Sequence, residues 1–185
     1  MRYPVWYWIV IGICLLFSMF FSSADMAYSV VDKNKLKKDM QKGNKFAKIA
    51  YNLATDYEFS IATILFGNNI VNILASSIVT IIGVIVFNPQ WGAAVATIIF
   101  TAVLILFSEY LPKAIAKRFN YKMSLIYAYP TLFFKYLFFI FVWPISKLFI
   151  AIGKLFKEKS VEEDILDEDV LTEMVDSIEE TGGIE

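Results

Sequence analysis

Two long stretches of the chain carry no charged residue. Residues 3–24 are uncharged throughout, and so are residues 59–108. A helix that crosses a bilayer needs about 20 apolar residues, so the first stretch can cross once and the second can cross twice. A cluster of turn-forming residues, Asn88-Pro89-Gln90-Trp91-Gly92, interrupts the second stretch. The pattern predicts three membrane-spanning helices, one within 3–24 and two at about 60–86 and 92–111.

The third apolar region, residues 123–156, is broken by prolines and lysines. Pro130, Lys135, Pro144 and Lys147 divide it into pieces that are too short to cross a bilayer. Basic residues flank it on both sides, so a single crossing would place one basic end on the wrong side. We therefore predict a re-entrant or interfacial pair of half-helices, broken at Pro144, whose lysines reach the lipid headgroups.

Composition and charge divide the chain into two units. Hydrophobic residues make up 58% of it and the mean hydropathy is +0.58, which excludes an ordinary soluble domain. Residues 1–157 hold 16 Lys and Arg against 6 Asp and Glu, whereas residues 158–185 hold 1 against 12. Apolar positions in the acidic part recur at helical spacing. The expected fold class is an all-α membrane protein, with three transmembrane helices and a juxtamembrane helical belt in residues 1–157 and a cytosolic acidic helix in residues 158–185.

The basic residues predict an orientation. Lysines crowd residues 33–48, and basic residues recur at 113–122; segments rich in Lys and Arg stay in the cytoplasm. We expect a multi-pass protein of the cell membrane with its N-terminus outside and its C-terminus in the cytoplasm. A cleaved signal peptide is the competing interpretation of residues 1–24, because Ser22-Ser23-Ala24 resembles a cleavage site. The apolar stretch is longer than that of a typical signal peptide, which favours a membrane helix.

Residue types that the chain lacks exclude several chemistries. The sequence has no His, which rules out His-based catalytic triads and zinc or haem sites with His ligands. An intramembrane acid pair would have to use Asp25 and Glu109, and both are expected near one interface. We therefore predict that the protein is not an enzyme. The lysines of residues 33–48 adjoin a span and fit anionic lipid rather than nucleic acid.

Polar side chains inside apolar spans are costly without partners, so they are candidate functional residues. Ser22, Asp25 and Ser29 fall on one helical face at the end of the first span. The alternative for this group is helix packing by small residues, which is common in membranes.

A second polar group lies in the second span. Asn68, Asn72 and Ser76 are four residues apart and form one stripe, and Asn69 borders it. Gly67 permits a local unwinding or a close approach of another backbone. An amide carbonyl is a hard, neutral oxygen ligand. The alternative is a structural hydrogen-bond network between helices.

The third polar group is Ser108-Glu109-Tyr110-Leu111-Pro112-Lys113, which contains the only acid between residues 59 and 157. Pro112 clashes with the carbonyl of Ser108, and a displaced carbonyl beside a buried carboxylate suits a cation. The alternative pairs Glu109 with Lys113 four residues on. Together the three groups offer oxygen ligands that suit Mg²⁺, Ca²⁺, Na⁺ or Mn²⁺ rather than Zn²⁺ or Cu⁺.

At these residues the chain resembles the transmembrane domain of the CorC / cyclin M (CNNM) family of magnesium transporters. That family shows Phe-Ser-Gly-Ser-Glu near the end of its first helix, Gly-Asn-Asn-x-x-Asn in its second and Gly-Glu-x-x-Pro-Lys at the end of its third. The matching stretches here are residues 21–25, 67–72 and 108–113. Three departures from the family pattern matter for an ion site: Ala24 lacks the hydroxyl of the family's second Ser, Asp25 is one methylene shorter than Glu, and Ser108 replaces Gly.

The resemblance implies secondary-active export of Mg²⁺, with Na⁺ influx as the implied coupling, by a homodimer in the lipid bilayer. Carried over residue by residue, it implies metal-site positions at Ser22, Asn68, Asn69, Asn72 and Glu109. It also implies a cytosolic CBS-pair module beyond the acidic segment, a module that these 185 residues do not include. The competing hypothesis is a membrane sensor or scaffold that binds Mg²⁺ without transporting it.

Overall fold

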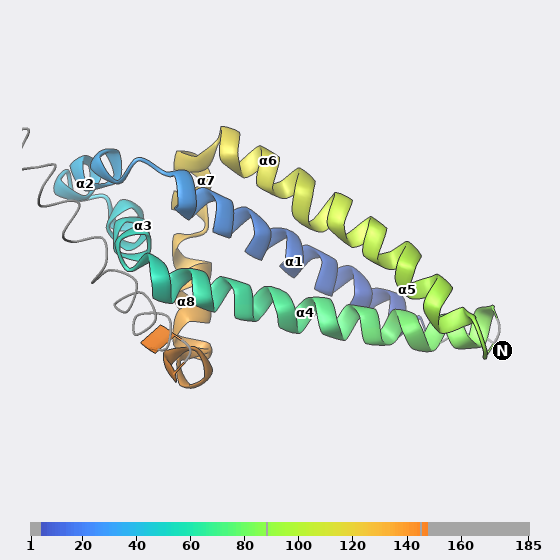
Figure 1. Cartoon of the computed structure of the whole chain (residues 1–185). Coiled ribbons are helices and arrows are strands. Elements are labelled where there is room, and N and C mark those ends of the chain that lie inside the picture. The colour runs from blue at the N-terminus through green and yellow to red at the C-terminus, as the bar shows by residue number, and fades with distance from the viewer. Residues whose placement is uncertain (1–4, 88, 145, 148–185) are drawn as a thin grey trace, which may run out of the picture. The chain divides into compact units, whose positions relative to one another are not determined.

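The computed structural model describes residues 5–87, 89–144 and 146–147. Every secondary-structure element in that part of the chain is a helix (Figure 1). The elements are α1 Trp6–Val30, α2 Lys33–Gln41, α3 Lys45–Thr55, α4 Tyr57–Val86, α5 Gly92–Val103, the π-helix η1 Leu104–Tyr110, α6 Leu111–Arg118, α7 Asn120–Ile126 and α8 Ala128–Leu137. The predicted acidic helix, residues 158–185, lies outside the described residues.

Among the described residues, three helices are long and apolar enough to cross a membrane, as the charge-free stretches predict. They are Trp6–Val30, Tyr57–Val86 and Gly92–Arg118. The first continues beyond its charge-free stretch and includes Asp25, and the third runs without interruption through α5, η1 and α6. The predicted all-α membrane fold with three spans is confirmed.

The third span contains a π-helical turn immediately before its proline. In η1 the hydrogen bonds close wider turns, and the N–H of Leu111 reaches back five residues to the carbonyl of Leu106. Pro112 follows at once; it has no N–H to donate and its ring crowds the preceding turn. A π-turn is one way in which a helix absorbs such a disturbance. The π-helical turn thus covers Ser108 and Glu109 and ends two residues before Pro112.

The third span changes its neighbour along its length. Its first part, α5, packs against α4, whereas η1 and α6 pack against α1. At the beginning of α5 the two backbones almost touch. A Cβ atom added to Gly83 of α4 would lie 2.4 Å from the carbonyl oxygen of Gly92 and 2.4 Å from the Cβ of Ala96. Small residues therefore set the spacing of α4 and α5, as is usual between membrane helices.

Two clusters of buried side chains hold the described helices together. One joins α1, α4, α5 and the first residue of η1, and consists of Ile11, Cys14, Ala75, Ile78, Ile82, Phe100 and Leu104. The other joins the opposite end of α1 to α2, α3, α4 and α8, and is built around Phe21, Ala24, Tyr28, Leu36, Leu53, Ile64 and Ala128.

The lysine-rich segment that follows α1 is helical. Asp32 caps α2 by accepting hydrogen bonds from two backbone N–H groups, and Asn44 caps α3 in the same way. Gly43 separates the two helices with a φ of 88°, a conformation that glycine adopts without strain. α2 buries only Leu36, and its lysines stay at the surface.

The predicted juxtamembrane belt begins with α7 and α8, which cross the ends of α1 and α4 at a steep angle (Figure 1). The Tyr28 hydroxyl donates to the carbonyl of Ser124 at 3.0 Å, and Lys135 pairs with Asp56 at 2.6 Å. The described part has breaks at Tyr127 and Phe138, which the sequence pattern did not predict. Most of the chain after the expected break at Pro144 lies outside the described residues.

Candidate functional site

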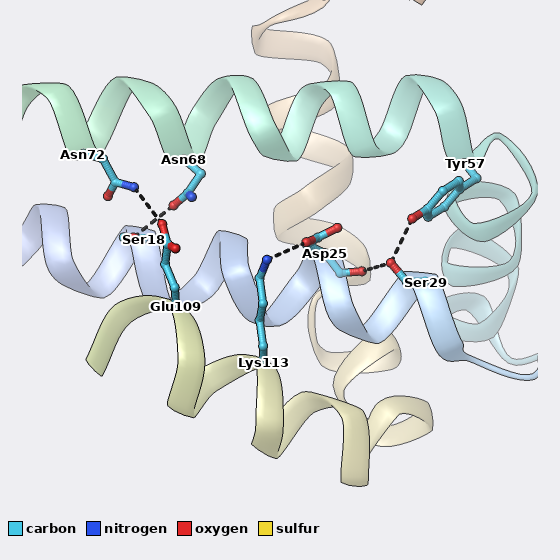
Figure 2. Close-up of polar contacts among 8 residues, drawn as sticks. All are labelled: Ser18, Asp25, Ser29, Tyr57, Asn68, Asn72, Glu109 and Lys113. Carbon is cyan, nitrogen blue, oxygen red and sulfur yellow. Dashed lines mark hydrogen bonds and ion pairs between the residues drawn. The ribbon is translucent and has the colours of Figure 1, made fainter. Parts of the chain in front are cut away.

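Glu109 extends from the third span toward the amides of the second. Its Oε1 atom lies 3.5 Å from Nδ2 of Asn72, which donates to it (Figure 2). Glu109 is in η1 and Asn72 is near the middle of α4. Both side chains are partly exposed. The contact joins two of the three predicted polar groups across two different spans.

These two residues line an open pocket of about 560 Å³ between α4, α5 and η1. Its polar lining consists of amide, hydroxyl and carboxyl groups, which come from Asn69, Asn72, Ser76, Ser77, Thr80, Thr101 and Glu109. Asn69 is exposed, whereas Asn72 and Ser76 are partly buried. The pocket therefore offers several uncharged oxygens and one carboxylate to whatever occupies it.

Asn68 is not among the residues that line this pocket, and its side chain bonds to the first span. Its Oδ1 accepts a hydrogen bond of 2.9 Å from the hydroxyl of Ser18 on α1 (Figure 2). Sequence analysis left open whether the asparagines form hydrogen bonds between helices, and Asn68 does form one. Ser18 itself was not among the predicted residues, although it lies four residues before Ser22 on the same face.

Ser22 does not belong to the residues that line the pocket. It is buried in α1 at 2% exposure, and its hydroxyl has no hydrogen-bond partner among the described residues. The hydroxyl of Ser108, next to Glu109, is buried and unpartnered in the same way. Of the five predicted site residues, the structure brings Asn69, Asn72 and Glu109 together, and places Asn68 and Ser22 on the side of α1.

Lys113 pairs with Asp25 of the first span. Its Nζ lies 3.2 Å from Oδ2 of Asp25, and the Asp25 side chain is only 14% exposed (Figure 2). The alternative in which Lys113 pairs with Glu109 is wrong for this structure. The lysine projects from the same side of the helix as Glu109, one turn further on, but α1 supplies its partner.

Gly67 serves a close approach and not an unwinding. α4 is a continuous helix from Tyr57 to Val86. A Cβ atom on Gly67 would come within 2.4 Å of the ring of Phe21 on α1. The glycine thus lets a large buried side chain of the first span lie against the backbone of the second, one residue before the asparagine group.

The donor set suits a hard cation. Within residues 5–87, 89–144 and 146–147, no three His, Cys, Asp or Glu side chains gather in one place. A cation in the pocket would therefore bind mainly neutral amide and hydroxyl oxygens, which favour Mg²⁺, Ca²⁺, Mn²⁺ or Na⁺ over soft metals.

Fold and site together define a multi-pass α-helical membrane protein with a polar pocket between its spans. Residues 9–185 match the family described as "Cyclin M transmembrane N-terminal domain". The chain belongs to this family, as the motifs of its three spans predict.

Curated relatives extend well beyond the length of this chain. It is 37% identical over 116 residues to a UPF0053 protein of Haemophilus influenzae, covering 63% of the chain and 27% of the relative. It is 33% identical over 138 residues to the UPF0053 inner membrane protein YfjD of Escherichia coli, covering 75% of the chain and 31% of the relative. A DUF21 domain-containing chloroplast protein of Arabidopsis thaliana is 25% identical over 96% of the chain and 27% of its own length. The chain thus spans about a third or less of these relatives.

Proposed function

We propose that the chain is the transmembrane domain of a secondary-active Mg²⁺ exporter, and that the pocket between α4, α5 and η1 is its ion site. The observation that carries the proposal is the convergence of Asn72 and Glu109 from two spans on one open pocket. A carboxylate within a membrane span is expensive to maintain and marks ion pathways. The family to which the chain belongs supports a transport role.

The pocket can replace part of the hydration shell of a hard ion. Mg²⁺ needs nearly octahedral oxygen coordination at about 2.0–2.1 Å and keeps several waters. Glu109 supplies the negative charge, and the amides supply neutral oxygens. Rotating the Asn72 amide by half a turn exchanges the Nδ2 that now faces Glu109 for Oδ1. Asn72 can therefore hold the carboxylate in place before an ion binds and then serve as a ligand.

A site with one carboxylate binds a divalent ion with moderate strength and releases it readily, as transport requires. We propose that Na⁺, which takes the same oxygen ligands, moves in the opposite direction as the coupling ion. We also propose a homodimer with the N-terminus outside and the C-terminus in the cytoplasm. The lysines of α2 and α3 and the basic residues of α6 and α7 support this orientation because they lie toward one end of the spans (Figure 1).

The test is Mg²⁺ flux in liposomes that contain the full chain. We expect Glu109→Gln to lower flux at least about tenfold, because it removes the charge that attracts the ion. Asn72→Ala should lower it as well. Glu58→Gln and Asn52→Ala are matched controls, since both residues are exposed and lie outside the pocket. Wild-type flux in both pocket variants would refute the proposal. Mg²⁺ binding without any flux by the wild-type chain would identify a sensor instead.

A further inference from the structure

Two carboxylates and one ammonium group stand close together at the end of the third span. Glu109 and Lys113 lie one helical turn apart and line a second pocket, of about 480 Å³, together with Met26, Tyr110 and Lys117. Asp25 faces Lys113 from α1. Glu109 thus borders both this pocket and the asparagine-lined one.

The position of Lys113 creates a problem for any cation site at Glu109. Residues four apart on a helix can form an ion pair, and a lysine has a flexible stem and a compact charge. If the Lys113 ammonium group paired with Glu109, it would neutralise the carboxylate and repel a divalent ion. Two charges a few ångströms apart interact strongly even in a partly polar environment.

The structure shows where the ammonium group goes instead. Lys113 Nζ is 3.2 Å from Asp25 Oδ2, and the Asp25 side chain is 14% exposed against 39% for that of Lys113. Glu109 keeps a neutral partner, the amide of Asn72. Figure 2 shows the two side chains of the third span in parallel, each directed to a different helix.

We propose that Asp25 is a positioning residue that holds Lys113 away from Glu109 and so leaves that carboxylate available to a divalent cation. The inference rests on the proposed ion site. It gives Asp25 a role that does not require contact with the ion. It also explains why an acid on the first span and a lysine on the third belong to the same site.

The test measures Mg²⁺ binding to the full chain in detergent by calorimetry, with a series of variants at the ion pair. Asp25→Asn releases Lys113, and we expect it to weaken binding on the order of tenfold. Asp25→Asn combined with Lys113→Gln removes the competing charge and should restore binding to within a factor of about two of wild type. Asp25→Glu keeps the ion pair and should bind as wild type does.

The matched control uses a lysine of the same pocket. Lys117 is eight residues from Glu109 on the same face, and Asp25→Asn with Lys117→Gln should stay as weak as Asp25→Asn alone. If Asp25 only stabilised the packing of α1 against α6, or bound the ion directly, the Lys113 double variant would remain weak, and that result would overturn the proposal.

Two further variants separate the possible failures. Lys113→Gln alone should bind Mg²⁺ as tightly as wild type or more tightly, so weaker binding contradicts the proposal even if Asp25→Asn does not fold. Glu109→Gln tests the ion site itself. Loss of binding in Glu109→Gln with wild-type binding in a folded Asp25→Asn would refute the positioning role and leave the proposed function intact.

Discussion

The contact between Gly83 and Gly92 allows a sharp test of how α4 and α5 pack. In Gly83→Ala the new Cβ would lie 2.4 Å from both the Gly92 carbonyl oxygen and the Ala96 Cβ. Ordinary van der Waals contact begins at 3.4 Å, so the helices must part by about 1 Å. A gap of that size forfeits roughly a quarter to a half of the attraction between packed atoms. Both obstacles lie on the backbone or at a Cβ, so no flexible side chain can give way.

Gly12→Ala is the matched control. Gly12 is also inside a membrane-spanning helix, but a Cβ there meets nothing within 4 Å. Both substitutions gain the same helix propensity, at most about 1 kcal/mol, so this gain cancels in the comparison. Overpacking costs about 1–3 kcal/mol, and we expect Gly83→Ala to be about 2 kcal/mol less stable than Gly12→Ala.

The measurement is equilibrium unfolding of the purified chain in mixed micelles with increasing SDS, followed by circular dichroism. Equal unfolding free energies for the two variants would refute the reasoning, because they would mean that the close approach of α4 and α5 does not constrain the fold.

Two further predictions concern hydrogen bonds between helices. The hydroxyl of Tyr121 donates to Asp39, which lowers the pKa of Asp39 and raises the pKa of Tyr121 to about 12. The ordinary pKa is 3.8 for Asp39 and 10.0 for Tyr121, and between these two pH values the bond should contribute its full stabilisation. At lower pH the contribution should fall as Asp39 takes up a proton, and at higher pH it should fall as the pH rises through about 12 and Tyr121 loses its proton. Tyr121→Phe should therefore lose stability mainly inside that window, and a difference that does not depend on pH would contradict this. The second bond lies in the membrane spans, where Thr80 donates its hydroxyl hydrogen to the Ser76 carbonyl and Thr97 therefore donates to Thr80 at 3.0 Å. Thr97→Val should lower the free energy of unfolding by about 0.6 kcal/mol. An unchanged unfolding free energy in the same SDS titration would show that the bond contributes nothing.

The spans were predictable because lipid imposes a simple rule on sequence. A backbone in hydrocarbon must satisfy its own hydrogen bonds as a helix, so two uncharged stretches with a turn between 87 and 92 leave few alternatives. The helices α2 and α3 were harder to foresee. Their sequence is dominated by lysine, and the signals that indicate helices are the caps at Asp32 and Asn44 and the glycine between them.

Side-chain partners across helices were the part that sequence could not supply. A stripe of residues four apart predicts a shared face, but it does not say which neighbour that face meets. Asn68 and Asn72 belong to one predicted stripe, yet one bonds Ser18 of α1 and the other Glu109 of η1. Likewise, Glu109 lies four residues before Lys113 on the same span, but Lys113 forms its ion pair with Asp25 of α1. Such choices depend on how three helices are spaced, which single-helix periodicity does not encode.

The glycine contact at one end of α4 and α5 has a mechanical consequence. The beginning of the third span is clamped by backbone against backbone, whereas its far end is held to α1 through side chains, among them one ion pair. If the third span tilts about this contact, geometry requires its far end, where Lys113 lies, to move further than its beginning.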